Sequence, residues 1–321
     1  MPLTEEDLMH VPGLLSRWAL LPGGVRAHYV TAGETGPAVV LLHGGIAGSS
    51  GLAGWRSVAG FLGANGFRVY CPDLPGFGLT VDAADFYRAG PVGHRDFVHD
   101  FADALVLDRF HLGGNSMGCA VAAYFLVTHP HRVTSFALVA GSVGDLVADP
   151  PVPTANGRAR TRRFDGTAAS MREMLTSIVL DPATISDDLV EMRTRHALRN
   201  EAAYRRHQQA PRDATTAVAL ATKGRLDRLG IPGIYVYGRQ DRLISAEDRG
   251  YAQEDALPGV QFFYPDRCGH QAQTDRPDVV GPLLLELFRD GVVSGPTAES
   301  AGVSDRRPVN PDLVAAAKEH P

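Results

Sequence analysis

The 321-residue chain is predicted to fold as an α/β protein with a doubly wound, mostly parallel sheet and one helical insertion. Two observations support this fold class. Apolar runs typical of buried strands alternate with helical patterns up to residue 145 and again after residue 215. Between them, residues 146–215 show helical patterns but no convincing strand.

Composition and charge restrict the function classes. Hydrophobic residues make up 44% of the chain and charged residues 21%, as in ordinary globular proteins. The 31 Lys and Arg against 36 Asp and Glu give a net charge of −5, which argues against a nucleic-acid partner. No apolar run reaches the ~20 residues that span a bilayer. The first residues lack a signal-peptide pattern, so we expect a cytoplasmic protein without membrane contact.

The cysteines give no sign of a disulfide framework. Cys71, Cys119 and Cys268 are few and widely spaced, and they match no metal-ligand spacing. We therefore expect reduced thiols and neither a metal nor a cofactor. Cys119 is interpreted as a small buried packing residue.

The first part of the chain, residues 1–145, follows a strand–helix alternation punctuated by Gly-Gly and Gly-Pro breaks. AVVLL at 38–42 is continuously apolar, as in a strand covered on both faces. Expected strands are 16–22, 24–33, 38–45, 67–78 with its turn, 110–112 and 133–141, and expected helices are 55–62, 96–107 and 119–128.

In the insertion, residues 170–180 and 186–200 have helical patterns. Ser186 is expected to cap the second helix, with Asp187 and Asp188 in its first turn, where the helix dipole favours acids. The core resumes over 216–291. Expected elements there are strands within 233–241 and 261–270 and a helix over 278–290. The tail, residues 292–321, is rich in Gly, Ser and Pro, and we expect it to be disordered.

Gly114-Asn115-Ser116-Met117-Gly118 fits the G-x-S-x-G motif of a nucleophilic serine. The match alone is weak, because a serine in a glycine-rich turn would look the same. The predicted strand before it and helix after it favour a strained turn that exposes the serine. The amino end of that helix also suits a developing oxyanion.

A nucleophilic serine needs a base, and the base needs an orienting acid. Asp241 and His270 follow Ser116 in the order this turn implies, each where a predicted strand ends. Singly, Asp241 could cap a turn and His270 could be one of 12 ordinary histidines. Together they predict a Ser116–His270–Asp241 triad, with Asp145 as the reserve acid.

LLHGG at 41–45 ends a strand with two glycines. This fits the loop that supplies one amide of an oxyanion hole, here from Gly45, while Met117 after the serine supplies the other. A plain glycine turn is the alternative.

Residues ~25–290 resemble the α/β-hydrolases, and more narrowly the meta-cleavage product hydrolases, which split carbon–carbon bonds in ring-opened aromatics. LLHGG, PDLPGFG and CGHQAQ are shared by many α/β-hydrolases. GGNSMG, YGRQDRLIS and MREMLTSIVLDPATISDDLVEMR complete the likeness. The chain departs from the family pattern at Gln271, where Trp is common, in the loop GGIAGSS, and at Cys119, where Gly is frequent.

The resemblance implies that the insertion is a lid and that Ser116, Asp241 and His270 are catalytic. It implies that Asn115 and Arg193 hold the carboxylate and enol oxygen of a 2-hydroxy-6-oxo-dienoate, and we expect Gly44 to be a third substrate-binding residue. Residues 147–213 contain 11 Arg against 9 acidic residues, a mild attraction for an anion. Arg193 on a solvated helix face, and Asn115 bonded only to backbone, are the alternatives.

Three functions are left open by these patterns. A C–C hydrolase of a small, anionic and partly apolar substrate leads. A carboxylesterase or lactonase of small apolar acyl substrates would use the same triad. A non-catalytic ligand-binding protein on this scaffold is the third, because fold does not fix function. Homo-oligomerisation is left open.

Overall fold

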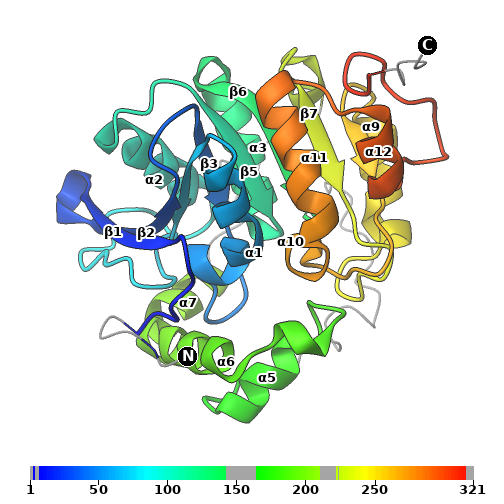
Figure 1. Ribbon diagram of the computed structural model, residues 1–321. Coiled ribbons are helices and arrows are strands. Elements are labelled where there is room, and N and C mark those ends of the chain that lie inside the picture. The colour runs from blue at the N-terminus through cyan, green and yellow to red at the C-terminus, as the bar shows by residue number, and fades with distance from the viewer. Residues whose placement is uncertain (1–2, 4–6, 142–163, 210–221, 223, 316–321) are drawn as a thin grey trace.

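A single eight-stranded sheet forms the centre of the computed structural model, which describes residues 3, 7–141, 164–209, 222 and 224–315 (Figure 1). The strand order is β1-β2-β4-β3-β5-β6-β7-β8. β1 and β4 are antiparallel to β2 and all other neighbours are parallel, which confirms the predicted mostly parallel sheet. The strands are β1 Leu15–Leu20, β2 Arg26–Ala32, β3 Ala38–Leu42, β4 Arg68–Pro72, β5 Phe110–Asn115, β6 Val133–Val139, β7 Gly233–Val236 and β8 Gln261–Phe263.

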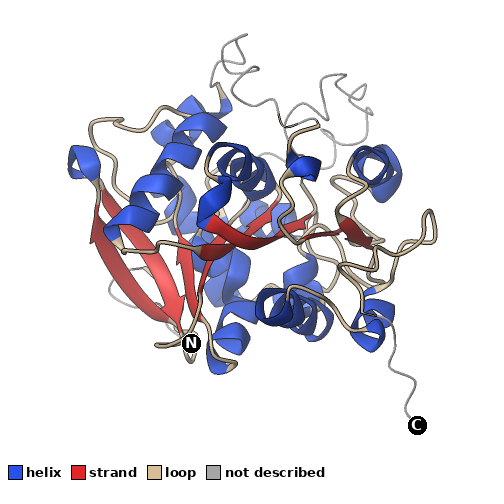
Figure 2. Cartoon of the chain, turned by 90° about the horizontal axis from the view of Figure 1, so that it is seen from above, coloured by secondary structure: helices blue, strands red, loops and turns tan. Residues whose placement is uncertain are grey.

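Helices cover both faces of the sheet, which is seen edge-on in Figure 2. On one face of the sheet α1 packs against α10 and α11, and on the other face α2 packs against α3. All five residues of β3 are buried, because helices cover both sides of this strand. No described helix is both long and apolar enough to cross a bilayer. The core helices are α1 Gly51–Ala64, α2 Pro91–Ala104, α3 Met117–Thr128, α9 Tyr251–Ala256, α10 Ala272–Asp275 and α11 Pro277–Asp290.

The described part of the insertion is helical and lies together at one end of the sheet, below the core in Figure 1. It contains α5 Ala168–Leu175, α6 Asp187–Arg199 and α7 Glu201–Gln208. Ser186 caps α6 as predicted, because its hydroxyl accepts a hydrogen bond from the Leu189 amide at 3.2 Å. The remainder of the insertion, and Asp145, lie outside the described residues.

The tail differs from its prediction. Residues 292–315 are ordered and contain the helix α12 Gly295–Ala301. Val303 pairs with Phe263 of β8, and Val293 pairs with Val314. The tail therefore covers the free edge of β8, which would otherwise present unpaired backbone groups. The expectation of disorder is wrong for this segment.

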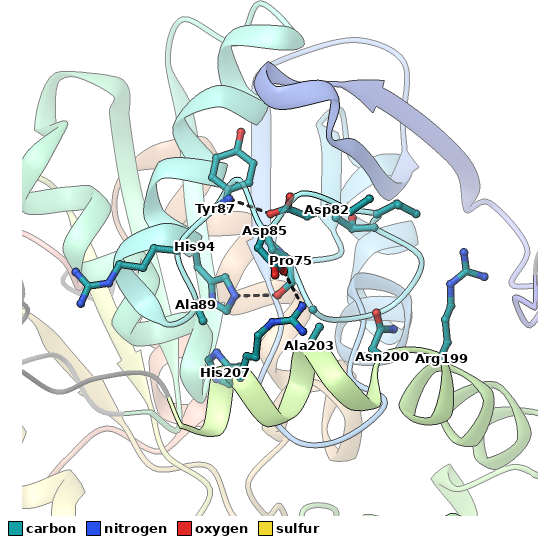
Figure 3. Close-up of a pocket in the computed structure, with 16 residues that line it drawn as sticks. Pro75, Asp82, Asp85, Tyr87, Ala89, His94, Arg199, Asn200, Ala203 and His207 are labelled. Atoms are coloured by element: carbon teal, nitrogen blue, oxygen red, sulfur yellow. Dashed lines mark hydrogen bonds and ion pairs between the residues drawn. The ribbon is translucent and has the colours of Figure 1, made fainter.

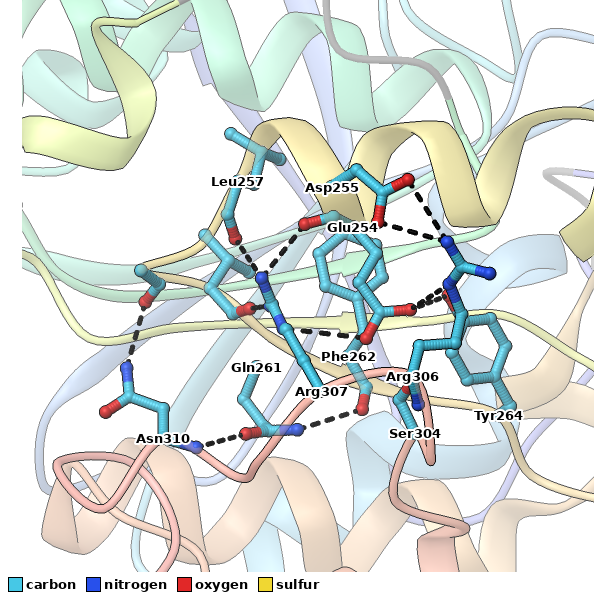
Figure 4. Close-up of polar contacts among 12 residues, drawn as sticks. Glu254, Asp255, Leu257, Gln261, Phe262, Tyr264, Ser304, Arg306, Arg307 and Asn310 are labelled. Atoms are coloured by element: carbon cyan, nitrogen blue, oxygen red, sulfur yellow. Dashed lines mark hydrogen bonds and ion pairs between the residues drawn. The ribbon is translucent and has the colours of Figure 1, made fainter.

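Two tail arginines hold a buried carboxylate (Figure 4). Glu254 of α9 is fully buried, and its carboxylate lies 3.6 Å from Arg306 Nε and 3.5 Å from Arg307 Nε. The Tyr264 hydroxyl donates to the same carboxylate at 2.8 Å. Arg307 also donates to the carbonyls of Glu254, at 2.9 Å, and of Leu257, at 3.1 Å. These contacts join the tail to the α9–β8 region.

We expect Arg307→Met to lower the free energy of unfolding by about 2 kcal/mol, because it leaves the buried Glu254 with fewer partners. This loss of stability is smaller than that expected for a buried carboxylate with no partner, because Arg306 and Tyr264 still contact Glu254. For a chain of 321 residues that corresponds to a fall in Tm of about 3 °C. Urea unfolding followed by circular dichroism measures the change.

Arg306→Met is the matched control. Arg306 is more exposed and its strongest partner, Asp255, lies at the surface, so its loss should matter less. No loss of stability in Arg307→Met would mean that the tail is not held through Glu254.

Candidate active site

Ser116 lies on the sharp turn between β5 and α3. Its backbone has φ 56° and ψ −116°, a conformation that costs energy in any residue except glycine. The motif glycines make this turn feasible. A Cβ at Gly114 would overlap the carbonyl of Gly118, and a Cβ at Gly118 would overlap the carbonyl of Leu42. The turn therefore holds the half-buried serine at the carboxyl end of the sheet, beside the amino end of α3.

Asp241 and His270 lie beyond the carboxyl ends of β7 and β8, and they contact each other. The Asp241 carboxylate and Nδ1 of His270 are 2.8 Å apart, and both residues are buried. The other Asp241 oxygen accepts the amides of Leu243 at 2.8 Å and Ile244 at 2.9 Å. Those amides fix the carboxylate, and the carboxylate fixes the imidazole with Nδ1 as the protonated nitrogen.

Because Nδ1 of His270 is bonded to Asp241, Nε2 is the ring nitrogen that can exchange a proton with a reacting group. It is buried and has no hydrogen-bond partner among the described residues. The loop around His270, here called the histidine loop, lies next to the serine turn, because the side-chain amide of Asn115 donates to the His270 carbonyl at 3.1 Å. In a triad, this Nε2 accepts the serine proton.

The loop after β3 lies against the serine turn. A Cβ on Gly44 would lie 3.3 Å from Cβ of Ser116, and one on Gly45 would lie 3.0 Å from Cβ of Met117. The Met117 amide, at the first position of α3, has no acceptor within its helix. The structure thus brings together the loop and the amide that the sequence singled out for an oxyanion hole.

His43 has a structural role in this loop that the sequence analysis did not assign. Nδ1 bonds the Gly44 carbonyl at 2.7 Å, and Nε2 accepts the Leu74 amide at 3.0 Å. Burial lowers the pKa of His43 to about 4, so the ring is neutral at pH 7. A neutral ring with Nδ1 protonated satisfies both bonds and fixes the loop beside Ser116.

Asn115 uses both hydrogens of its amide on the backbone. It donates to Val139 of β6 at 3.0 Å and to His270 at 3.1 Å. Its side-chain oxygen is buried without a partner in the described part of the chain. The side chain ties β5, β6 and the histidine loop together, which matches the backbone-bonding alternative for this residue.

Arg193 of α6 is a buried cation beside the same loop. It is 1% exposed, and one nitrogen donates to the Ala47 carbonyl and the Ser49 hydroxyl, each at 3.3 Å. Its Nε is unpartnered, and no described carboxylate forms an ion pair with it. Burial, and then the nearby Arg56, lower its pKa to about 9, which leaves it protonated at pH 7. The predicted alternative of a solvated helix face is wrong.

The helical insertion and the histidine loop share hydrogen bonds through Asp275, another residue that the sequence did not single out. Its carboxylate accepts the amide of Gly269 at 2.8 Å and those of Leu180 at 2.9 Å and Asp181 at 3.2 Å. The Gln271 amide donates to the Ile178 carbonyl at 2.9 Å. Burial raises the pKa of Asp275, although these amides oppose the shift.

Comparison with known proteins identifies the family. The α/β-hydrolase fold family model matches residues 37–277. A 2-hydroxy-6-oxononadienedioate/2-hydroxy-6-oxononatrienedioate hydrolase of Paraburkholderia phymatum is 30% identical over 291 residues, covering 88% of this chain and 99% of the relative. A 2-hydroxy-6-oxo-6-phenylhexa-2,4-dienoate hydrolase of Burkholderia cepacia is 29% identical over 269 residues, covering 83% and 92%.

Solved structures agree with this assignment. A 2-hydroxy-6-oxo-6-phenylhexa-2,4-dienoate hydrolase from a Rhodococcus species superposes with a TM-score of 0.68 at 27% identity, covering 86% of this chain and 99% of that one. A meta-cleavage product hydrolase from Pseudomonas fluorescens, at 23% identity and a TM-score of 0.70, covers 86% and 98% and shares the fold. The chain is therefore a hydrolase of the α/β-hydrolase family, and it is similar to the meta-cleavage product hydrolases.

Proposed function

We propose that this enzyme hydrolyses a carbon–carbon bond in a 2-hydroxy-6-oxo-dienoate, with Ser116, His270 and Asp241 as the catalytic triad. The names of the relatives support the reaction class. The 2.8 Å bond between Asp241 and His270 and the unpartnered Nε2 support the triad.

The observation that carries the substrate class is the Arg193 guanidinium. A buried cation without a carboxylate is costly unless a ligand pairs with it. Arg193 contacts residues 47 and 49 of the loop whose glycines lie against Ser116. A carboxylate bound by Arg193 would place the rest of a dienoate along this loop, toward the serine. A planar guanidinium also suits a carboxylate better than a neutral acyl group.

The chemistry follows from these positions. His270 first assists conversion of the dienol to its keto form by moving a proton. Ser116 then adds to the distal carbonyl while His270 takes the hydroxyl proton, and the Gly45 and Met117 amides stabilise the oxyanion. Cleavage of the C–C bond releases a 2-hydroxydienoate, protonated by the His270 imidazolium. Water hydrolyses the acyl-serine and releases the second acid.

The first experiment mixes the protein with a yellow 2-hydroxy-6-oxo-dienoate and follows the visible absorbance together with the acid products. Rapid bleaching with formation of both acids is expected. Hydrolysis of a nitrophenyl ester without cleavage of the dienoate would instead make the protein an esterase or lactonase, in which Gln271 and the GGIAGSS loop have reshaped the pocket. Turnover of neither substrate would favour a ligand-binding protein.

Asp275→Asn is expected to lower kcat by about 10- to 100-fold with little change in KM. Only one oxygen would remain for the amides of Gly269 and Leu180, and the histidine loop would lose its link to the lid. Steady-state kinetics at several pH values separates kcat from KM.

Asp278→Asn is the matched control, because this exposed carboxylate on the next helix pairs only with Arg276 in the described structure. It should leave kcat unchanged. If Asp275→Asn lowered Tm but spared kcat, Asp275 would stabilise the fold without positioning His270.

A further inference from the structure

The backbone just beyond β6 lies directly against the turn that carries Ser116. A Cβ on Gly141 would lie only 2.2 Å from the Ser116 carbonyl oxygen and 2.6 Å from Sγ of Cys119. The Ser116 amide donates to the carbonyl of Val139, the last residue of β6, at 2.9 Å. Residues 139–141 therefore support the serine from behind, and the position of the turn depends on the position of this segment.

This segment is strained at Ala140. Its φ is 50°, in the left-handed region, where a Cβ crowds the backbone and glycine is favoured. Such conformations persist where surrounding contacts hold them, and they are common at active sites. On one side, the Ala140 amide donates to the Val236 carbonyl of β7 at 2.9 Å. On the other side, the next residue, Gly141, is held by side chains.

Three buried side chains converge on the Gly141 carbonyl. The Tyr235 hydroxyl donates to it, as do the Tyr237 hydroxyl at 2.8 Å and Nε2 of Gln253 at 3.1 Å. Nε2 of Gln253 also donates to the Tyr237 hydroxyl at 2.5 Å, so Tyr237 lies at the centre of the cluster. One donor is enough to satisfy a buried carbonyl. The additional donors indicate that this cluster fixes the orientation of the Gly141 carbonyl.

The cluster is rigidly packed. Tyr235 and Tyr237 project from the same face of β7, and their rings stack with centroids 5.1 Å apart and planes 7° apart. Both tyrosines are fully buried, and Gln253 reaches them from α9. Phenylalanine would supply the same stacking without a buried hydroxyl that needs an acceptor. The two hydroxyl groups therefore point to a role in holding Gly141.

We propose that Tyr237 is a positioning residue for the nucleophile. Through Gly141 it holds Ala140 in the left-handed conformation, and this backbone keeps the Ser116 hydroxyl where His270 can take its proton. Tyr235 and Gln253 contribute to the same contact. The inference rests on the proposed function, because it takes Ser116 as the nucleophile.

A fluorophosphonate tests this role, because Oγ of Ser116 displaces fluoride from phosphorus efficiently only when His270 accepts the hydroxyl proton. The rate constant of labelling is measured on the full chain by mass spectrometry of the intact protein, and Tm is measured alongside. Tyr237→Phe should slow labelling about tenfold, since a small displacement of the nucleophile is costly. The midpoint of the pH–rate profile should stay in place, because the Asp241–His270 bond is unchanged.

Ala140→Gly supplies the rescue. Glycine adopts a φ of 50° without strain, so Tyr237→Phe combined with Ala140→Gly should be labelled within about twofold of the wild-type rate.

Tyr87→Phe is the matched control. Tyr87 lies on the wall of a cavity of about 240 Å³ between the loop after β4 and α7 (Figure 3), and its hydroxyl donates to Asp100 at 2.8 Å. The substitution removes a tyrosine hydroxyl bond that does not involve Gly141. It should lower Tm and leave the labelling rate unchanged.

Labelling of Tyr237→Phe at the wild-type rate, a shifted midpoint, or no rescue by Ala140→Gly would overturn the positioning role. Equal slowing by Tyr87→Phe would also overturn it, because lost stability alone would then explain the effect. A wild type that is not labelled would contradict Ser116 as the nucleophile, and with it the proposed function as well as this role.

Discussion

Replacing Ser116 with alanine is expected to lower kcat for the dienoate by at least about 10³-fold, or roughly 4 kcal/mol of barrier. The alanine cannot form the acyl intermediate, while the Asp241–His270 bond stays in place. Turnover of a nitrophenyl ester should fall by a similar factor, because both reactions use the same hydroxyl. Product acids measured by chromatography give the rate of bond cleavage directly.

Absorbance alone would not suffice for this variant. His270 is retained, so the dienol can still become its keto form and lose colour without cleavage. Ser135→Ala is the matched control, since this buried serine of β6 bonds only His111 in the described structure, at 2.8 Å. It should keep normal turnover. Near-normal cleavage by Ser116→Ala would point to a water activated by His270 in place of the serine.

The core elements were predictable because their signals are local. AVVLL predicted a buried strand, and β3 is buried throughout. The positions of Asp241 and His270 after apolar strands predicted their meeting, because parallel strands end at one edge of the sheet. β5 extends to Asn115, beyond the predicted Leu112, because the strand continues up to the strained serine. The sequence did not predict this extension of the strand, because Gly113 and Gly114 lack the β-branched or aromatic side chains that are typical of strands.

The tail was mispredicted because its stabilising contacts are long-range. Arg306 and Arg307 give no local sign of order, and Glu254 lies some fifty residues earlier in the chain. Composition reports how much apolar surface a segment can bury by itself. Composition does not show that another part of the chain offers the tail a buried carboxylate and an unpaired strand edge to bind. The hydrogen bonds of Asp275 and His43 escaped prediction for the same reason.

The burial of Arg193 was more accessible to sequence reasoning. It lies four residues after Leu189 and four before Ala197, so all three project from one face of α6. Leu189 and Ala197 are buried, and the helix places Arg193 between them. A cation within an apolar stripe indicates a buried charge, and hence a partner or a ligand.

Replacing Arg193 with glutamine is expected to raise KM for the anionic dienoate by about 100-fold, because a buried guanidinium–carboxylate contact contributes several kcal/mol. Hydrolysis of a neutral nitrophenyl ester should change by less than about threefold, since no charge is lost from that complex. Arg193→Lys should recover part of the affinity, because it restores the charge but not the two-pronged geometry. Steady-state kinetics on both substrates gives the comparison.

The contrast between the substrates separates binding from structure. Arg193 also contacts Ala47 and Ser49, and its backbone carbonyl leaves no room for a Cβ at Gly48. If its role were only to hold this loop, the glutamine variant would impair the ester and the dienoate alike. Arg195→Gln, two residues along α6 at the surface, should affect neither. An unchanged KM for the dienoate in Arg193→Gln would exclude the anionic substrate and leave an esterase or lactonase.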